Sequence, residues 1–472
     1  MLRPMEIQFI GAAQTVTGSM HLVRTKAGAI LLDCGLFQGP RRESIEVNRH
    51  LRVPMREVKA VVLSHAHIDH SGALPLLFKQ GYAGPVYATP ATRSLATVML
   101  RDAAAIQESD ARYLNKQAKK EGLGDEPIEP LYDDDDVVRV IEKMIAVPYH
   151  TTVPLLGGVN LTFFDAGHVL GSAVTVLDVE EDGSRKRVAF TGDLGRAERP
   201  ILRDPEVVSD VDLLITESTY GDRLHDPRDK MDEDLGRVIS STIRRGGRVI
   251  IPSFALERAQ EIIVAIKQLK RTGAIPRSLP VYVDSPLTVR VTDVFKLHPE
   301  CYDHETRQMM RGDDSPFEFD DLTYVEDKEL SKRVSSSGEP AVVISASGMC
   351  EAGRVLHHLR TAVEDPKNTV LIVGYQAVHT LGRRLVEKRA RVKIFGVERE
   401  RRCEVVVMNG FSAHADQRDL VTYAQRTLER GAVSKVCLVH GDPQPQRILG
   451  QKLNDAGLAD VVIPAPGDRL SF

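Results

Sequence analysis

The sequence has no tryptophan and only five cysteines among its 472 residues. The cysteines are scattered and never form a Cys-x-x-Cys pair: Cys34, Cys301, Cys350, Cys403 and Cys437. This spacing argues against a disulfide framework and against a zinc site made of thiolates, and it fits a reducing cytoplasm. No apolar run approaches the roughly 20 residues of a transmembrane helix, and the N-terminus has no signal-peptide pattern. We therefore expect a cytoplasmic protein with no membrane partner.

A strong excess of charge of either sign is also missing, since 62 lysines and arginines face 66 aspartates and glutamates, for a net charge of −4. Any site for a polyanion must therefore be built from local basic groups or from metal ions. Hydrophobic residues make up 42% of the chain and charged residues 27%, which excludes wholesale disorder. At roughly 100–200 residues per domain, the length corresponds to about two to four domains.

The pattern of apolar residues changes twice along the chain. Up to about Tyr220, short strand-like runs such as Ala60–Ser64 lead into polar loops. From there strand and helix patterns alternate, as in Arg248–Ile251 followed by Leu256–Leu269, which indicates a parallel sheet flanked by helices. Beyond about Val392 the strand-rich pattern returns. We therefore predict an α/β domain inserted into a β-rich domain.

The strongest chemical signal is the segment His65-Ala66-His67-Ile68-Asp69-His70, which directly follows an apolar strand. A tight loop at the end of a buried strand can point such side chains into one cleft. Imidazole and carboxylate ligands suit a zinc ion that keeps positions open for water. A single histidine would more often be an ordinary core or surface residue, but this spacing predicts a metal site.

Three more strands end in a candidate ligand among small residues: His168, Asp193 and His440. Each is weak alone, because Gly-Asp and His-Gly are also plain turn residues. Together with the first segment they supply five histidines and two aspartates, enough for two metals that share a carboxylate. Two metals suit phosphodiester hydrolysis, because they bind the phosphate, activate a water and neutralise developing charge. Single-metal hydrolysis of a thioester or a lactam is the chemical alternative.

These motifs resemble those of the metallo-β-lactamase superfamily, and Leu31-Leu32-Asp33-Cys34-Gly35 is similar to its early aspartate motif. Three further segments resemble the β-CASP nuclease branch: Glu217–Gly221 its motif A, Gly410–Asp416 its motif B and Leu438–Gly441 its motif C. The resemblance covers about residues 7–445. It is strongest to the RNA-processing group, which includes the endonuclease subunit of the pre-mRNA cleavage and polyadenylation machinery and its compact bacterial relatives.

The resemblance implies a fold class and a domain organisation. The fold is α/β, with a metallo-β-lactamase αββα sandwich and an inserted β-CASP α/β domain that has a parallel sheet flanked by helices. The sandwich would comprise residues 1–218 and 394–472, and the inserted domain residues 219–393. The family also implies a homodimer.

The resemblance further implies two zinc ions per chain, with manganese as the alternative ion. The ligands of the first ion would be His65, His67 and His168. The ligands of the second would be Asp69, His70 and His440. Asp193 would bridge both ions, and Asp33 would orient a ligating histidine from behind.

The candidate catalytic residues are Asp69, Glu217 and His414. In this family pattern His414, paired with Glu217, would be the general acid that protonates the leaving oxygen, because a carboxylate fixes the tautomer and keeps a proton on the imidazole. Taken alone, Glu217 would be a solvent-exposed carboxylate and His414 an ordinary residue at a helix start. His440 stands where DNA-acting relatives carry valine, which favours RNA as the substrate.

Three segments of the predicted insertion resemble phosphate-binding segments of the RNA group. Small-residue turns after strands expose backbone N–H groups that can hold an anion, and guanidinium groups bind phosphate. The candidate phosphate contacts are Ser345, Ser347, Gly348, Arg258, Thr380 and Arg383. A tight turn without a ligand is the alternative for the first segment. We expect Phe254 in the core, and the basic stretches Arg383–Lys393 and Arg399–Arg402 to be mainly solvated faces.

The sequence therefore predicts a zinc-dependent ribonuclease. It would hydrolyse single-stranded RNA, internally or from the 5′ end, with a hydroxide activated by two metals, and leave 5′-phosphate and 3′-hydroxyl ends. One alternative is a DNA nuclease of the same superfamily. A second is a metal-dependent hydrolase of small esters or lactams, against which the large insertion argues. A third is a non-catalytic RNA-binding subunit, against which the filled ligand positions argue.

Overall fold

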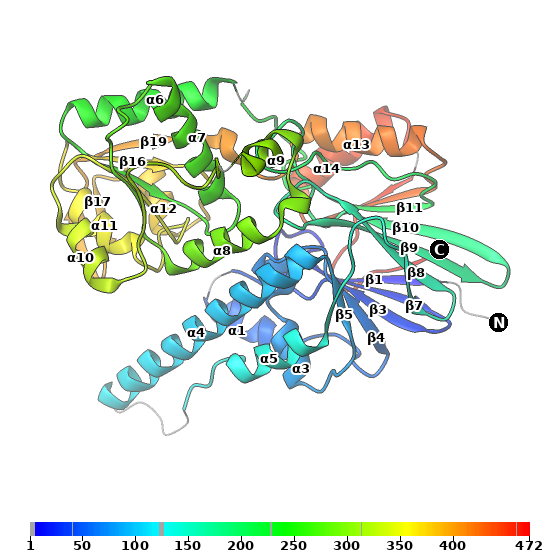
Figure 1. The fold of residues 1–472 in the computed structure, drawn as a ribbon. Helices are drawn as coiled ribbons and strands as arrows, with labels where there is room; N and C mark the ends of the chain where they lie inside the picture. The colour runs from blue at the N-terminus through cyan, green and yellow to red at the C-terminus, as the bar shows by residue number, and fades with distance from the viewer. Residues whose placement is uncertain (1–4, 40, 122–126, 227–228, 313, 459) are drawn as a thin grey trace. The chain divides into compact units, whose positions relative to one another are not determined.

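The computed structural model describes residues 5–39, 41–121, 127–226, 229–312, 314–458 and 460–472 (Figure 1). The chain forms two compact units. Unit 1 consists of Met1–Arg199, Arg203–Leu224 and His414–Phe472, and unit 2 of Pro200–Leu202 and His225–Ala413. A parallel α/β unit thus interrupts the chain of a strand-rich unit, which agrees with the predicted fold class.

Unit 1 contains two seven-stranded sheets. The first has the order β22 (Arg469–Ser471), β1 (Glu6–Gly11), β2 (Met20–Thr25), β3 (Gly28–Leu32), β4 (Val58–Val62), β5 (Val86–Ala88) and β6 (Met144–Ala146). The second has the order β21 (Val461–Val462), β20 (Lys435–Val439), β11 (Leu213–Glu217), β10 (Ser184–Phe190), β9 (Ala173–Glu181), β8 (Val159–Asp165) and β7 (Val153–Leu156). In each sheet antiparallel hairpins give way to parallel neighbours, namely β3 to β6 in the first and β10, β11, β20 and β21 in the second.

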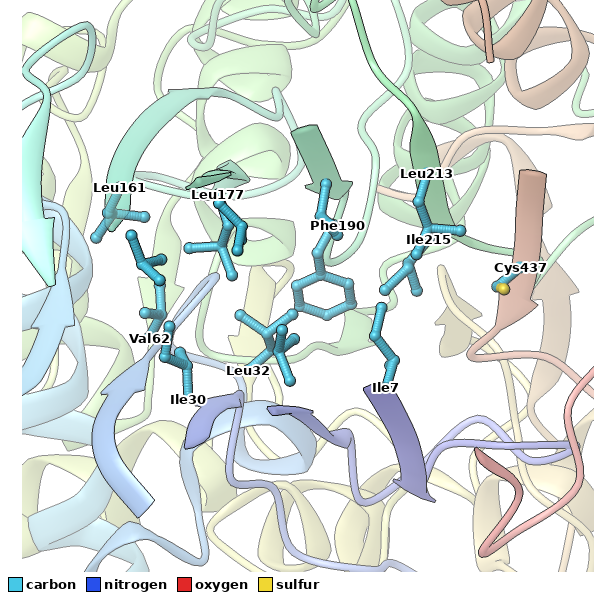
Figure 2. Packing of buried hydrophobic residues seen from close by; sticks show 14 of the residues in the cluster. Ile7, Ile30, Leu32, Val62, Leu161, Leu177, Phe190, Leu213, Ile215 and Cys437 are labelled. Atoms are coloured by element: carbon cyan, nitrogen blue, oxygen red, sulfur yellow. The ribbon is translucent and has the colours of Figure 1, made fainter. Parts of the chain in front are cut away.

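The main core of unit 1 lies between these two sheets. Figure 2 shows Ile30 and Leu32 of the first sheet pointing toward Phe190 and Leu177 of the second. All four side chains are fully or almost fully buried. Alternate residues of a strand share a face, so the intervening positions of the second sheet, such as Leu214, form a separate apolar layer. That layer packs against helices near the C-terminus.

Seven α-helices accompany the sheets within the described part of unit 1. They are α1 (Arg41–Arg49), α2 (Ile68–Ser71), α3 (Leu74–Lys79), α4 (Pro90–Glu121), α5 (Asp134–Lys143), α13 (Gln417–Glu429) and α14 (Pro443–Asp455). Buried Leu420 of α13 and Leu449 of α14 belong to the outer apolar layer of the second sheet. Helices α3 to α5 contact one another and β6. These helices and the two sheets form the layered sandwich that the family resemblance implies.

Unit 2 is built on a six-stranded parallel sheet. Its order is β14 (Leu322–Tyr324), β13 (Val281–Val283), β15 (Val342–Ser345), β12 (Val249–Pro252), β16 (Thr369–Ile372) and β19 (Glu404–Val407). Along β12, Val249 and Ile251 pack in one core with α6 (Asp229–Arg244) and α7 (Arg258–Thr272), while Ile250 packs in another with α11 (Val355–Ala362). Both faces are therefore covered by helices, as the continuous apolar strands predict.

The remaining elements of unit 2 are short. They are α8 (Pro286–Leu297), α9 (His304–Arg311), α10 (Lys328–Ser336), α12 (Leu381–Val386), two 3₁₀ turns (Pro299–Cys301 and Asn409–Phe411) and the hairpin of β17 (Arg391–Ile394) and β18 (Val397–Glu400). Because β19 pairs with β16, unit 2 continues to Ala413, beyond the predicted return at residue 394. Among the helices of the described residues, none is long and apolar enough to cross a membrane.

Candidate metal centre and catalytic pair

The candidate ligands follow the carboxyl ends of strands in unit 1. His65 follows β4, His168 follows β8, Asp193 follows β10 and His440 follows β20. Since β10, β11 and β20 run parallel side by side, their carboxyl ends meet at one edge of the sheet, as ligand-bearing ends do in α/β folds. Residues far apart in the sequence are brought together in this way.

The structure gathers all seven candidate ligands into two groups, within each of which the ligand atoms lie within 4.8 Å of one another. The first group is His65, His67, His168 and Asp193. The second group is Asp69, His70 and His440. A third group within the same distance consists of Asp193, Glu217 and His414.

Asp193 lies at the centre of the cluster. Its Oδ2 is 3.5 Å from His65 Nε2 and 3.3 Å from His70 Nε2. Its Oδ1 is 3.3 Å from His440 Nδ1. One carboxylate therefore contacts imidazoles of both groups of candidate ligands.

Asp33 supports the cluster from behind. Its Oδ2 lies 2.7 Å from His70 Nδ1, so the carboxylate accepts the Nδ1 proton and leaves Nε2 facing Asp193. Ser19 Oγ and Ser64 Oγ donate to the same oxygen at 3.1 and 3.0 Å. The sequence did not predict a role for these two serines. They lie 14 and 31 residues from Asp33 along the chain, and no local pattern links them to it.

Gly35 makes this arrangement possible. A Cβ at position 35 would lie 1.6 Å from the carbonyl oxygen of Asp69, so only glycine lets the two segments approach. The contact is fixed by backbone hydrogen bonds, since Cys34 N donates to His70 O at 2.8 Å and Leu36 N to Ile68 O at 3.0 Å. The early aspartate motif and the histidine-rich loop thus form one packed structure.

The donor set fits metal binding. Burial lowers the pKa of His65 and of His168 well below the ordinary range, which keeps both imidazoles in the neutral form that metals require. Buried His168 Nδ1 has no hydrogen-bond partner among the described residues. Buried polar atoms normally have partners, and imidazole and carboxylate together are ligands of zinc and similar divalent ions.

His414 and Glu217 form a pair beside this cluster. Glu217 is fully buried at the end of β11, and its Oε1 accepts from Leu194 N at 2.7 Å. His414 Nδ1 lies 3.1 and 3.2 Å from the two carboxylate oxygens of Glu217 and 3.8 Å from Asp193 Oδ2. Burial lowers the pKa of His414, but the carboxylates of Glu217 and Asp193 outweigh it and raise the pKa to about 9.

The predicted phosphate contacts all lie in unit 2, and their side chains are engaged within that unit. Ser345 Oγ is buried and donates to Asp284 O at 2.7 Å. Buried Arg258 pairs with Glu261 at 3.0 Å, and Arg383 pairs with Glu387 at 2.9 Å.

The other three have local roles. Ser347 Oγ donates to Ala352 O at 3.2 Å, and Thr380 Oγ1 accepts from Arg383 N at 3.1 Å to cap α12. Gly348 lies against Phe254, because a Cβ at position 348 would be 2.8 Å from the Phe254 ring. The expectation that Phe254 is a core residue is wrong, since the residue is 41% exposed; it sits in the loop after β12, where the chain turns away from the core.

Comparison with known families agrees with this architecture. Residues 14–241 match the metallo-beta-lactamase superfamily, residues 259–385 the Beta-Casp domain and residues 398–464 the Zn-dependent metallo-hydrolase RNA specificity domain. The three matches follow one another along the chain in the order that the motifs predict.

Individual relatives extend over nearly the whole chain. The chain is 35% identical over 449 residues to Ribonuclease TTHA0252 of Thermus thermophilus, covering 95% of this chain and 96% of that protein. It is 33% identical to the transcription termination factor FttA of Methanosarcina mazei and 31% identical to that of Pyrococcus horikoshii, covering 66% and 67% of their lengths. A crystal structure of a protein of unknown function from Enterococcus faecalis V583 shares the fold, with a TM-score of 0.54 and 13% identity over 99% of this chain and 100% of that one.

The seven clustered ligands explain why a metal-dependent family fits this chain. The superfamily match implies that the cluster binds divalent metal, and the Thermus thermophilus relative is 35% identical over almost its full length. The chain therefore belongs to the β-CASP metal-dependent hydrolases of the metallo-β-lactamase superfamily.

Proposed function

We propose that the protein is a zinc-dependent ribonuclease that hydrolyses phosphodiester bonds of single-stranded RNA. The observation that carries the proposal is the position of Asp193, which contacts both groups of histidines while lying 3.8 Å from the His414–Glu217 pair. A site with two groups of ligands beside a protonatable imidazole suits in-line displacement at phosphorus.

The proposed ligand assignment follows the two groups. His65, His67 and His168 would hold one ion, and Asp69, His70 and His440 the other, with Asp193 shared. When bound, the two ions supply charge stabilisation for the phosphate and a nucleophile at neutral pH. Zinc is the proposed ion, with manganese as the alternative, because five imidazoles and two carboxylates suit borderline ions.

The chain's own contribution to the chemistry is proton transfer to the leaving group. Glu217 accepts the Nδ1 proton of His414, which fixes the tautomer and leaves Nε2 for the leaving 3′ oxygen. A raised pKa keeps His414 protonated at neutral pH, as a general acid requires. The products would carry 5′-phosphate and 3′-hydroxyl ends.

RNA is favoured over DNA by three independent features. His440 stands at the position where DNA-acting relatives carry valine. Residues 398–464 match an RNA specificity domain, and the relative covered over 96% of its length is named a ribonuclease. A small ester or lactam is disfavoured because unit 2, with its own six-stranded sheet, would serve no purpose for such a substrate.

The domain organisation is part of the proposal. We assign residues 1–218 and 394–472 to the metallo-β-lactamase domain and residues 219–393 to the inserted β-CASP domain. The division of the chain into two compact units supports the insertion itself, while the second unit extends to Ala413. A cytoplasmic location is supported by five free, buried cysteines, and a homodimer stays a prediction from the family.

Cleavage of end-labelled nucleic acid tests the proposal. Zinc-loaded protein is incubated with single-stranded RNA labelled in turn at its 5′ and 3′ ends, and with DNA of the same sequence. We expect cleavage of RNA only, its loss in a chelator and its return with zinc or manganese. The label pattern separates internal cleavage from attack at the 5′ end. No cleavage of either strand by protein with two bound metals would overturn the proposed activity.

A further inference from the structure

A second pocket lies entirely within unit 2 and contains none of the residues assigned above. It has a volume of about 340 Å³ and is bounded by the loop before α11, by α12 and by the turn of the β17–β18 hairpin. Five of the side chains that line it can contact a ligand through charge or an aromatic face: Glu351, His379, Arg384, Lys393 and Phe395. Its volume falls within the roughly 300–1,000 Å³ of small-molecule sites.

Phe395 has an unusual position in this pocket. The two residues of the hairpin turn, Phe395 and Gly396, have φ values of 51° and 79°. A two-residue turn with two positive φ angles favours Asn-Gly, and a bulky aromatic at the first position is strained. Burial does not explain the choice either, since Phe395 is 51% exposed.

An aromatic neighbour adds to the exposed surface of Phe395. The His357 ring lies 4.8 Å away, with an angle of 46° between the ring planes. Strained residues are retained where the surrounding structure or a ligand requires them. His379 and Cys350, which also line the pocket, have positive φ values of 74° and 61°. Three non-glycine residues with positive φ therefore line this one cavity.

The two cations of the pocket have no carboxylate partner in the part of the chain that the structure describes. Arg383 and Arg391, which lie beside them in the sequence, pair with Glu387 and Glu398. For Arg384 and Lys393, no ion pair is found among the residues that the structure describes. Arg384 donates only to a backbone oxygen, that of His379 at 3.3 Å, in a hydrogen bond that leaves its positive charge uncompensated. An unpaired guanidinium and ammonium at one cavity favour an anion such as phosphate.

Glu351 restricts which anion fits. It is the one acidic side chain that lines the pocket, and its Oε1 accepts from Leu381 N at 2.5 Å. A carboxylate repels a bare anion but accepts hydrogen bonds from hydroxyl or amino groups. The ligand should therefore carry a phosphate, hydrogen-bond donors and a flat face that stacks on an aromatic ring. A nucleotide combines all three.

We propose that this pocket binds one nucleotide, with its base stacked on Phe395 and its phosphate at Arg384 and Lys393. The nucleotide would be part of the single-stranded RNA substrate. This choice of source rests on the proposed function, whereas the type of ligand follows from the pocket's own side chains. Stacking on an aromatic side chain with a phosphate held by cations is the common mode of single-strand binding. The pocket would then act as a remote anchor that holds the strand.

The test measures binding without cleavage. A fluorescently labelled, unstructured oligoribonucleotide is titrated with wild type and Phe395→Asn in a chelator, and affinity is followed by fluorescence anisotropy. Asparagine suits the turn, so this variant should fold at least as well as wild type. We expect about tenfold weaker binding, because base stacking is lost. The matched control is Val397→Asn, which replaces an exposed apolar residue of the same hairpin outside the pocket lining and should bind as wild type.

A charge series gives the second readout. Arg384→Gln and Lys393→Gln should each reduce the slope of log affinity against log salt concentration by about 0.7, the value for one phosphate contact with a single strand. Arg391→Gln, in the same hairpin but paired with Glu398, should leave the slope unchanged. Equal affinity and equal slopes for all variants would overturn the proposal.

Free nucleoside monophosphates test whether the pocket takes a nucleotide of an RNA strand or a free nucleotide. Competition with the oligonucleotide, lost in Phe395→Asn, would support the nucleotide site on RNA. Monophosphate binding that depends on Phe395 while RNA binding does not would overturn RNA as the source. If Phe395→Asn binds RNA normally in a protein that cleaves RNA, this inference fails and the proposed function stands. If the wild type binds nucleotides through Phe395 but cleaves no RNA, the proposed function fails and the pocket stands.

Discussion

The strand ends of the two units carry polar residues of very different kinds. In unit 1 they carry imidazoles and carboxylates that face one another, and buried His168 Nδ1 has no hydrogen-bond partner among the described residues. In unit 2 polar side chains after the strands bond to neighbours of the same unit, as Ser345 Oγ does to Asp284 O and Arg258 to Glu261. Imidazoles gathered around one carboxylate suit a metal ion, whereas a hydroxyl bonded to a carbonyl oxygen or a paired guanidinium holds a loop in place.

The same contrast appears on a smaller scale within unit 2. Arg383, which resembles a family phosphate contact, is paired with Glu387. Arg384, its neighbour, lines a pocket and has no carboxylate partner among the described residues. By family resemblance alone, Arg383 is the better candidate for a phosphate contact. By its local electrostatics, Arg384 is the better candidate. Four variants sharpen these comparisons, from the largest expected effect to the smallest.

His414→Ala should have the largest effect on activity. Loss of a general acid typically costs about 10²–10⁴-fold in rate, and the variant should keep its metals because His414 is not among the proposed ligands. Single-turnover cleavage with metal analysis of the same sample measures both quantities. Glu217→Gln is the companion variant, with a smaller loss expected because the imidazole remains. Wild-type rates for His414→Ala would contradict its assignment.

Asp33→Asn should weaken metal binding rather than chemistry. The amide cannot accept the His70 Nδ1 proton as a carboxylate does, and loss of such a supporting group costs about 10–100-fold in metal affinity. Competition with a coloured chelator measures the affinity. Asp182→Asn, at an exposed turn of unit 1, is the matched control. Equal affinities for the two variants would show that Asp33 does not support the centre.

Asp284→Asn should destabilise unit 2 in a manner that depends on pH. Burial raises the pKa of Asp284, but hydrogen bonds from His358, Ser331 and Arg354 outweigh it and hold the pKa below its ordinary value. Such a carboxylate stabilises the folded state above its unfolded pKa of about 3.9, and this contribution is lost as the pH falls through the lower folded pKa. At pH 7 we expect a loss of about 1–3 kcal/mol in the free energy of unfolding.

Denaturant unfolding of wild type and Asp284→Asn across a pH series measures this difference. The two curves should converge as the pH falls below about 4, because the wild-type carboxyl then also loses its charge. Asp314→Asn, whose carboxylate pairs with Lys267 at an exposed position, is the control and should change stability little. A difference that stays constant with pH would contradict the role of the Asp284 charge.

Arg383→Gln should have the smallest effect. An exposed pair such as Arg383–Glu387 contributes little to stability because water screens it, so the variant should fold normally. Because its guanidinium is held by Glu387, it should also weaken RNA binding less than Arg384→Gln does. Anisotropy titrations of the two single variants compare them directly. A larger loss for Arg383→Gln would favour the family pattern over the local electrostatics.

Some features were predictable because their signals are local. The histidine-rich loop carries four candidate ligands within six residues, and the strand predicted at Arg248–Ile251 is β12 (Val249–Pro252), shifted by one residue. The fold class followed from alternating strand and helix patterns together with the family resemblance. The helix predicted at Leu256–Leu269 is α7, which begins two residues later, at Arg258, and continues to Thr272.

Other features depend on contacts between residues far apart in the sequence. Glu217 and His414 are 197 residues apart, so only the family resemblance suggested their pairing. The pairing of β19 with β16 extends unit 2 past the predicted boundary, because a four-residue strand carries no mark of the sheet it joins. The stretch Arg383–Lys393 was interpreted as a mainly solvated face, since sequence does not reveal which of its cations lack partners. The strain at Phe395 is likewise visible only in the backbone angles.

The central claim is a two-metal centre with Asp193 between the ions. The most direct test is a crystal of the zinc-loaded protein, measured at the zinc absorption edge. The account predicts two anomalous peaks in unit 1, one among His65, His67 and His168 and the other among Asp69, His70 and His440, both adjacent to Asp193. A single peak, or peaks that do not contact Asp193, would contradict it.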